Sequence, residues 1–179
     1  MVNHYLLWAT GADRPGIVAA VTQVLFDNDC NIEDSSMLRL GSEFGVLLIF
    51  SSPRRYSSPS ATALFNAAAK KFSLAVNVKP LSKNEAAFRL VKKAMYMVSL
   101  HGADRPGLVY RLTAALAKHK FNISDLMTHR TASGSKPGYI LFVEGELPGS
   151  PVRLEGELAA LAKKLSTKIQ IRPLADESI

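Results

Sequence analysis

The stretch that decides the fold is Gly11-Ala12-Asp13-Arg14-Pro15-Gly16, because the chain carries it twice. The same six residues return unchanged as Gly102-Ala103-Asp104-Arg105-Pro106-Gly107, a shift of 91 from residue 11 to residue 102. Further matches at this shift are Asn31 with Asn122, Ile32 with Ile123, Asp34 with Asp125 and Arg39 with Arg130. An internal repeat of this kind is the signature of a duplicated module. The chain of 179 residues is therefore predicted to contain two copies of one small domain.

The repeat continues after a change of spacing. Residues 45–50 match residues 138–143, and residues 70–72 match residues 163–165, both at a shift of 93. The second copy is thus predicted to have gained two residues within the stretch 131–137, whose Ser, Gly and Pro content is typical of a turn. Turns at the surface tolerate such insertions.

The first half of each copy is predicted to run strand, helix, strand. Apolar runs at residues 5–10 and 95–101 predict a buried strand that ends at glycine. Apolar residues then recur with the spacing of one helical face, so a helix follows in each copy. We expect Pro15 and Pro106 in its first turn, with Asp13 and Asp104 as N-caps. After the first helix, residues 31–40 predict the next strand.

The second half of each copy is predicted to run strand, helix, strand. In the first copy, residues 41–44 read as a hairpin turn and residues 45–51 as its second strand. A second helix is predicted over residues 60–72 and 151–165, with Ser60 as an N-cap and Pro151 at the first helical position. Its inward residues are expected to be Ala61, Leu64, Ala68 and Phe72, and Leu154, Leu158, Leu161 and Leu165. Short strands at residues 74–80 and 167–173 complete the copies.

The predicted fold class is therefore α+β, with two ferredoxin-like βαββαβ units, each an antiparallel four-stranded sheet with two helices on one face. We expect the first domain over residues 1–81 and the second over residues 95–179. Residues 82–94, rich in Lys, Glu and Ala, are predicted to be a helical connector. Units this small are marginally stable alone, so packing against a partner module is expected.

Composition narrows the class of protein. The net charge of +7 is spread in short pairs along the chain, which indicates solvated faces more than a concentrated nucleic-acid surface. A single cysteine, Cys30, excludes an intrachain disulfide and a cysteine-based metal site, and suits a reducing cytoplasm. Neither a signal peptide nor an apolar run near 18 residues is evident, so we expect a cytoplasmic protein without membrane contact.

The strand-to-helix turn is the place where binding chemistry is expected. A helix N-terminus presents unpaired N–H groups and partial positive charge, which suit a carboxylate. Asp13 and Asp104 could hold an amino group, so the turn suits a zwitterion. The same residues also have a structural interpretation, with Asp as a cap, Arg solvated, and Gly and Asn in tight turns. Preservation of all six residues in both copies favours the binding interpretation.

The glycine-flanked Asp-Arg-Pro turn, the apolar helix, the Asn-Ile pair and the hairpin resemble the ACT domain, an amino-acid-binding regulatory module. The duplicated form is similar to the glycine cleavage system transcriptional repressor family, and each copy resembles the N-terminal ACT domain of formyltetrahydrofolate deformylases. The resemblance implies a ligand, with glycine as one candidate, at an interface between ACT units. The residues it implies are Asp13, Arg14, Pro15, Gly16, Ile17, Asn31, Ile32, Asp104, Arg105, Pro106, Gly107, Leu108, Asn122 and Ile123, with the Asn-Ile pairs facing the loops.

Enzyme and nucleic-acid functions have weak support in the sequence. The four histidines have no aligned partners between the copies, so no catalytic residue, metal ligand or cofactor is predicted. The strand at residues 46–50 lacks the aromatic pattern of an RNA-recognition motif, and no helix-turn-helix is evident. Its nearly continuous apolar character instead suggests a sheet covered on both faces.

The predicted function is a non-catalytic amino-acid sensor, expected to be a homodimer, that modulates a protein partner such as a transcription factor. Two alternatives stay open at this point. One is a regulatory subunit of a separately encoded metabolic enzyme, and the other is a nucleic-acid binder that uses its basic surface.

Overall fold

Alternation of buried and exposed residues orients strand β1, Asn3–Ala12. Tyr5, Leu7 and Ala9 are buried, whereas the intervening Trp8 and Thr10 lie on the opposite face of the sheet and are exposed. This period of two is what a half-buried strand requires. One side of β1 therefore belongs to the core, and the other side is left for solvent or a partner.

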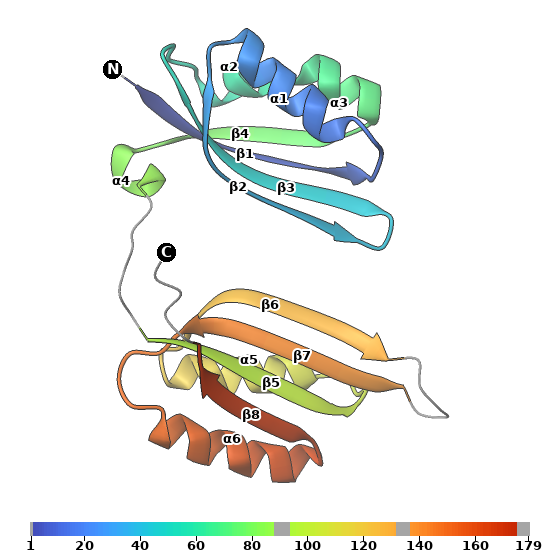
Figure 1. Ribbon diagram of the computed structural model, residues 1–179, viewed down its shortest axis with the longest axis vertical. Helices are drawn as coiled ribbons and strands as arrows, with labels where there is room; N and C mark the ends of the chain where they lie inside the picture. The colour runs from blue at the N-terminus through green and yellow to red at the C-terminus, as the bar shows by residue number, and fades with distance from the viewer. Residues whose placement is uncertain (1, 88–93, 132–136, 175–179) are drawn as a thin grey trace. The chain divides into compact units, whose positions relative to one another are not determined.

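Figure 1 shows the computed structural model, which describes residues 2–87, 94–131 and 137–174. The chain divides into two compact units, Met1–Arg89 (unit 1) and Leu90–Ile179 (unit 2). In unit 1 the elements after β1 are α1 (Ile17–Asp27), β2 (Asn31–Leu40), β3 (Glu43–Ser52), α2 (Ser58–Ala63), α3 (Asn66–Phe72) and β4 (Ala75–Leu81). The sheet order is β2-β3-β1-β4, and every neighbouring pair is antiparallel.

Unit 2 repeats this topology. Its elements are β5 (Met95–Ala103), α5 (Leu108–Lys118), β6 (Asn122–Thr131), β7 (Gly138–Glu146), α6 (Val152–Leu165) and β8 (Lys168–Pro173). The sheet order is β6-β7-β5-β8, again antiparallel throughout. In each unit the helices cover one face of the sheet (Figure 1). The predicted α+β fold of two ferredoxin-like βαββαβ units is confirmed.

After β4 in the chain, helix α4 (Lys83–Ala86) begins at Ser82 with a capping box. The Ser82 hydroxyl accepts from the Glu85 N–H, while the Glu85 carboxylate accepts from the Ser82 N–H. This reciprocal capping stabilises a helix start. The rest of the predicted connector, residues 88–93, lies outside the described residues.

The two cores differ in chemistry. In unit 1 the Tyr5 and Phe50 rings are stacked with centroids 5.1 Å apart, and Phe65 meets Phe50 edge-on at 6.3 Å. The buried core of unit 2 is mostly aliphatic, with Val98, Leu100, Leu112, Leu116, Leu141 and Leu154 fully buried. Two different sets of core side chains thus support the same topology. This is expected where the total core volume and the hydrophobic pattern of the sequence are retained.

The second helix of unit 1 corrects the prediction of one helix over residues 60–72. It is divided into α2 and α3, and its first N-cap is Ser57, whose side chain accepts from the Ser60 N–H. The chain turns at Leu64 and Phe65, so Phe65 is fully buried while Leu64 is only partly buried. In unit 2 the matching helix α6 is continuous, with Pro151 as its N-cap residue.

Strand pairing also corrects the predicted insertion. The β2–β3 turn contains two residues, Gly41 and Ser42, because Leu40 pairs with Glu43. The β6–β7 connection spans residues 132–137, so the second copy has gained four residues there, and not two. Accordingly, Leu47 opposite Trp8 in unit 1 corresponds to Phe142 opposite Ser99 in unit 2, a shift of 95. The residues 132–136 of the predicted turn lie outside the described residues.

Two glycines allow a test of the backbone requirement. Gly16 has φ +94°, a conformation costly for residues with a Cβ, so Gly16→Ala is expected to lower the free energy of unfolding by about 1–2 kcal/mol. Gly156 lies within α6, and a Cβ added there would meet open space. Gly156→Ala should therefore raise the free energy of unfolding by about 0.5–1 kcal/mol. Chemical denaturation of both variants measures this difference. Equal changes in the free energy of unfolding for the two variants would contradict the requirement for glycine at residue 16.

Candidate functional site

The loop between β1 and α1 positions the candidate site, and the structure corrects how the helix starts. Helix α1 begins at Ile17, and its N-cap is Gly16, with no side-chain capping bond. Pro15 therefore precedes the helix, and Asp13 is not a cap, contrary to prediction. The second copy has the same form, with Gly107 at φ +87° before Leu108. The positive φ of glycine turns the chain into the helix, which displaces Pro106 and Asp104 from the predicted positions.

Asp13 instead joins the loop to the β2–β3 hairpin. Its carboxylate lies 3.6 Å from the guanidinium of Arg39, near the end of β2, and its N–H donates to the Ser42 carbonyl at 2.8 Å. In unit 2 the Asp104 carboxylate lies 2.8 Å from the guanidinium of Arg130. Its N–H likewise donates to a hairpin carbonyl, that of Pro137, at 3.0 Å. The aspartate of the repeated hexapeptide thus has the same charged partner in both copies.

Two glycines of the hexapeptide permit close packing below the loop. A Cβ on Gly11 would lie 2.8 Å from the Leu74 side chain, and one on Gly102 would lie 2.4 Å from the Thr167 side chain. Both distances are far inside van der Waals contact. Packing alone explains why both copies have glycine at these positions. It does not explain why both copies have Asp and Arg in the hexapeptide.

A hollow of about 230 Å³ opens beside this loop. It is lined by Asp13, Arg14, Pro15, Gly16, Ile17, Val18, Met37, Leu38, Arg39 and Phe44. The structure thus brings together the five predicted loop residues 13–17 with the end of β2. The Asp13 side chain is 37% exposed and that of Arg39 71% exposed, so both charges are accessible to a small molecule.

Arg39 and Arg130 were missed as site residues by the sequence analysis. A signal was available, because the two arginines align at the same shift of 91 as the hexapeptide. Arg14 and Arg105 are exposed, and neither has an ion pair in the part of the chain that the structure describes. Of the predicted arginines, therefore, Arg14 lines the hollow without a charged partner.

Asn31 and Ile32 do not face the loop of their own unit. Asn31 pairs with Ser51, which pairs with His4 near the start of β1, whereas Arg39 lies at the far end of β2. Eight residues of strand separate Asn31 from Arg39, about 26 Å at 3.3 Å per residue. Asn122 and Ile123 begin β6 in the same way. The loop and the Asn-Ile pair of one unit are therefore too far apart to hold the same small ligand.

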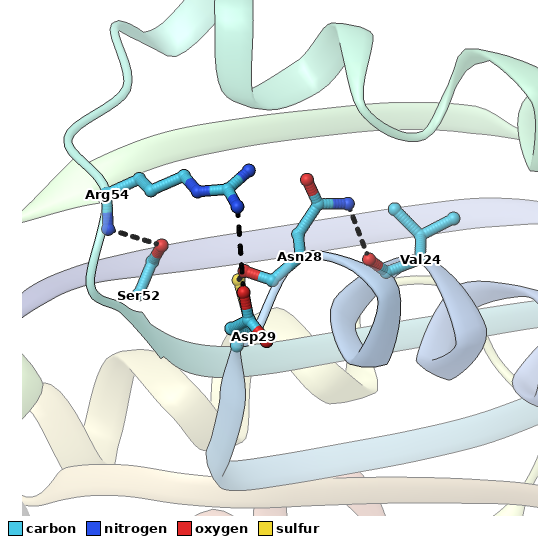
Figure 2. A network of polar contacts seen from close by, with 6 residues as sticks. Val24, Asn28, Asp29, Ser52 and Arg54 are labelled. Atoms are coloured by element: carbon cyan, nitrogen blue, oxygen red, sulfur yellow. Dashed lines mark hydrogen bonds and ion pairs between the residues drawn. The ribbon is translucent and has the colours of Figure 1, made fainter.

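A network of polar contacts holds the turn that leads into Asn31 (Figure 2). The Asn28 amide donates to the Val24 carbonyl at 2.8 Å, at the end of α1. Asp29, in a left-handed conformation with φ +56°, lies 3.6 Å from the Arg54 guanidinium, and the Arg54 N–H donates to the Ser52 hydroxyl at 3.1 Å. The start of β2 is thus tied to the end of β3.

Each copy has a β-bulge just after the Asn-Ile pair. In β2 the pairing shifts between Ile32 and Asp34, and in β6 between Ile123 and Asp125. The extra residue in unit 1 is Glu33, whose carboxylate accepts from Ser51 and Asn31; these hydrogen bonds hold its pKa below the ordinary value. Bulges re-aim side chains at sheet edges and beside functional sites. Their presence in both copies marks this strand end as a shared feature.

Cys30, next to this strand end, is half-buried, and burial raises the pKa of its thiol. A raised pKa disfavours the reactive thiolate at neutral pH. Among the described residues, no group of His, Cys, Asp and Glu side chains is arranged to hold a metal ion.

The edge strand β2 is uncovered. All ten of its residues are exposed, including the large apolar Met37, Leu38 and Leu40. Phe26 on the neighbouring helix α1 is also 77% exposed. In unit 2, Leu126 and Met127 of β6 lie exposed on the matching edge. Exposed apolar edges of this length are templates for pairing with another chain.

Both units of the chain match a known protein family. Residues 3–79 and residues 96–163 each match the ACT domain. The chain belongs to the ACT-domain family. Its two ACT units correspond to the two units of the structure, and within residues 2–87, 94–131 and 137–174 no helix is long and apolar enough to cross a membrane.

A relative is the glycine cleavage system transcriptional repressor of Escherichia coli K12, 34% identical over 128 residues. The match covers 70% of this chain and 65% of the repressor, and the repressor of Shigella flexneri matches equally. This ACT-domain chain thus spans just under two thirds of the length of the curated relatives it matches.

Solved structures share the fold of the paired ACT units. A protein of unknown function from Galdieria sulphuraria is 21% identical with a TM-score of 0.81, covering 98% of this chain and 100% of its own. A protein provisionally assigned as a glycine cleavage system transcriptional repressor is 22% identical with a TM-score of 0.68, covering 97% and 98%. At this identity the likeness concerns the fold alone.

The Asp–Arg pairs are expected to contribute little to stability. Both arginines are largely exposed, so double-mutant cycles with Asp13→Asn and Arg39→Gln, and with Asp104→Asn and Arg130→Gln, should each give a coupling below about 1 kcal/mol. Urea denaturation of the single and double variants measures these values. A coupling well above this limit would mean that the pairs are retained for structure and not for binding.

Proposed function

We propose that this ACT-domain protein is a non-catalytic regulator that binds a small amino acid at its β1–α1 loops and modulates a protein partner. The observation that carries the proposal is the hollow of about 230 Å³ that presents Asp13 and Arg39 side by side. One acidic and one basic side chain within 3.6 Å of each other match the two charges of an α-amino acid. The same pair recurs as Asp104 and Arg130.

The chemistry of the hollow suits a zwitterion. The guanidinium of Arg39 can bind a carboxylate through charge-assisted hydrogen bonds, supported by the partial positive charge at the N-terminus of α1. The Asp13 carboxylate can accept from the ammonium group. At 3.6 Å the Asp13–Arg39 contact is longer than a charge-assisted hydrogen bond, so in unit 1 both groups retain capacity for a ligand. In unit 2 Asp104 and Arg130, 2.8 Å apart, already form such a bond, which a ligand would have to replace.

The size of the hollow favours a small ligand. A volume of about 230 Å³ holds roughly seven waters at about 30 Å³ each, which a small amino acid would displace. Glycine is the first candidate, because the relative in Escherichia coli is a repressor of the glycine cleavage system. Met37, Leu38 and Phe44 form an apolar wall that leaves little to recognise a polar side chain.

We infer that the uncovered β2 edge pairs with β2 of a second copy of the chain. Antiparallel pairing of this strand brings Asn31 of one copy toward the Arg39 end of the other. The Asn-Ile pair, which begins β2 about 26 Å along the strand from Arg39, would then face the partner's loop. A ligand held by both copies would shift the pairing equilibrium by its differential affinity for the paired state. The partner that reads this shift is proposed to be a transcription factor, in keeping with the repressor name of the relative.

A ligand screen tests the proposal. Glycine at a hundred times its dissociation constant should raise the free energy of unfolding by about 2.7 kcal/mol, measured by thermal unfolding of the full chain. The double variant Arg39→Gln with Arg130→Gln should lose this response, whereas Lys70→Gln on α3 should keep it. Acetate and methylamine, which carry one charge each, should not replace the amino acid. Absence of stabilisation by every amino acid tested would contradict the proposal.

The edge pairing has its own test. Met37→Asp on β2 should convert a dimer to a monomer in analytical ultracentrifugation, because it places a charge on the exposed apolar edge. The control is Val152→Asp on α6, which changes a side chain of similar exposure, 68% against 61%, on another surface. A wild-type chain that is monomeric at all concentrations, with or without amino acid, would rule out the pairing.

A further inference from the structure

A second hollow lies on the sheet of unit 2, on the face opposite its helices. Its volume is about 440 Å³, and its walls include Met97, Ser99, His101, Phe142, Gln170 and Arg172. Val98 and Leu100, which alternate with the lining residues of β5, are fully buried on the helix side. This hollow is therefore built on the outer sheet surface, whereas the amino-acid hollow of unit 1 lies beside a loop.

The strongest hydrogen-bond donor in the walls of this hollow, the Arg172 guanidinium, has a weak acceptor. Within the described parts of the chain, the Arg172 guanidinium has one contact, to the Met97 sulfur at 3.3 Å. A thioether is a poor acceptor for a cation. The Ser99 hydroxyl and the Gln170 amide line the same space. An oxyanion would be a stronger partner for this guanidinium than the sulfur is.

The charges around the hollow favour an anion. None of its lining residues is acidic. Lys168 pairs with His101 across the β5–β8 ladder, which adds a further cation at one end. Glu144 lies opposite Met97 on β7, outside the lining. Glu146 lies opposite Met95 and Asp125 lies opposite Glu144 on the same face. The hollow is therefore positively charged on the β8 side and bordered by carboxylates toward β7 and β6, so an anion is expected to bind beside β8.

In unit 1 a larger side chain occupies the position that corresponds to Ser99. Trp8 pairs with Asn77 and Leu47, just as Ser99 pairs with Gln170 and Phe142. A tryptophan thus stands where the second copy has a serine. A hydroxymethyl group in place of an indole leaves space on the sheet, so the hollow follows from the side chains of the second copy and not from the shared fold.

We propose that this hollow binds a small organic anion, with carboxylate or phosphate oxygens on Arg172 and Gln170 and a flat apolar part against Met97 and Phe142. Arg172 and Gln170 are two residues apart on β8, so both side chains rise from the same face. The planar guanidinium matches either oxyanion. The His101 ring meets Phe142 edge-on at 5.9 Å, which forms an aromatic wall for the apolar part.

Titration of the isotope-labelled full chain with benzoate and with phenyl phosphate tests the proposal by NMR. The expected result is a saturable shift of the Arg172 guanidinium and Gln170 amide signals with at least one probe, and the more tightly bound probe identifies the oxyanion. Arg172→Ala should weaken binding at least about tenfold, the usual effect of losing a charged hydrogen bond. Lys79→Ala, the matching position in unit 1, should leave binding unchanged.

Ser99→Trp gives the second test, since it restores the side chain that unit 1 has at Trp8. It should abolish probe binding while the circular dichroism spectrum of the wild type is retained. Saturating glycine should not compete with the probes, which separates this site from the one proposed at the loops. The proposal is overturned if neither probe shifts these signals, or if binding survives both Arg172→Ala and Ser99→Trp.

Discussion

The docking of the β1–α1 loop onto the neighbouring hairpin is the constraint on which the rest of the structure depends. In both units an aspartate N–H donates to a hairpin carbonyl, and its carboxylate faces an arginine near the end of the edge strand. Glycine at positive φ then turns the chain into the helix. This arrangement sets where the helix N-terminus points, and it leaves one acidic and one basic group at the same small opening.

Each unit leaves part of its sheet uncovered. Helices cover one face of each sheet, while β2 is exposed along its whole length and carries large apolar side chains. A unit of this size buries too little surface to be more than marginally stable alone. A bulge follows the Asn-Ile pair in β2, and the network around Asp29 and Arg54 ties this end of the strand to the end of β3 (Figure 2). An uncovered apolar edge of this kind is suited to association with another chain.

Duplication has allowed the two copies to diverge away from this shared loop. The core of unit 1 contains an aromatic cluster and that of unit 2 is mostly aliphatic, and the second hairpin is four residues longer. On the outer sheet surface, a tryptophan in the first copy corresponds to a serine in the second. These changes cost little because each lies at a hairpin tip, within a core of similar volume, or on an open face.

The sequence by itself determined the repeat, the order of elements and the inward face of the helices, because each depends on local periodicity or identity. Tertiary structure alone decided the rest. Strand pairing revealed the shift of 95, since a change by two residues leaves every side chain on the same face. It also separated Asn31 from the loop and joined Asp13 to Arg39, because distances across a sheet depend on register, which no local pattern encodes.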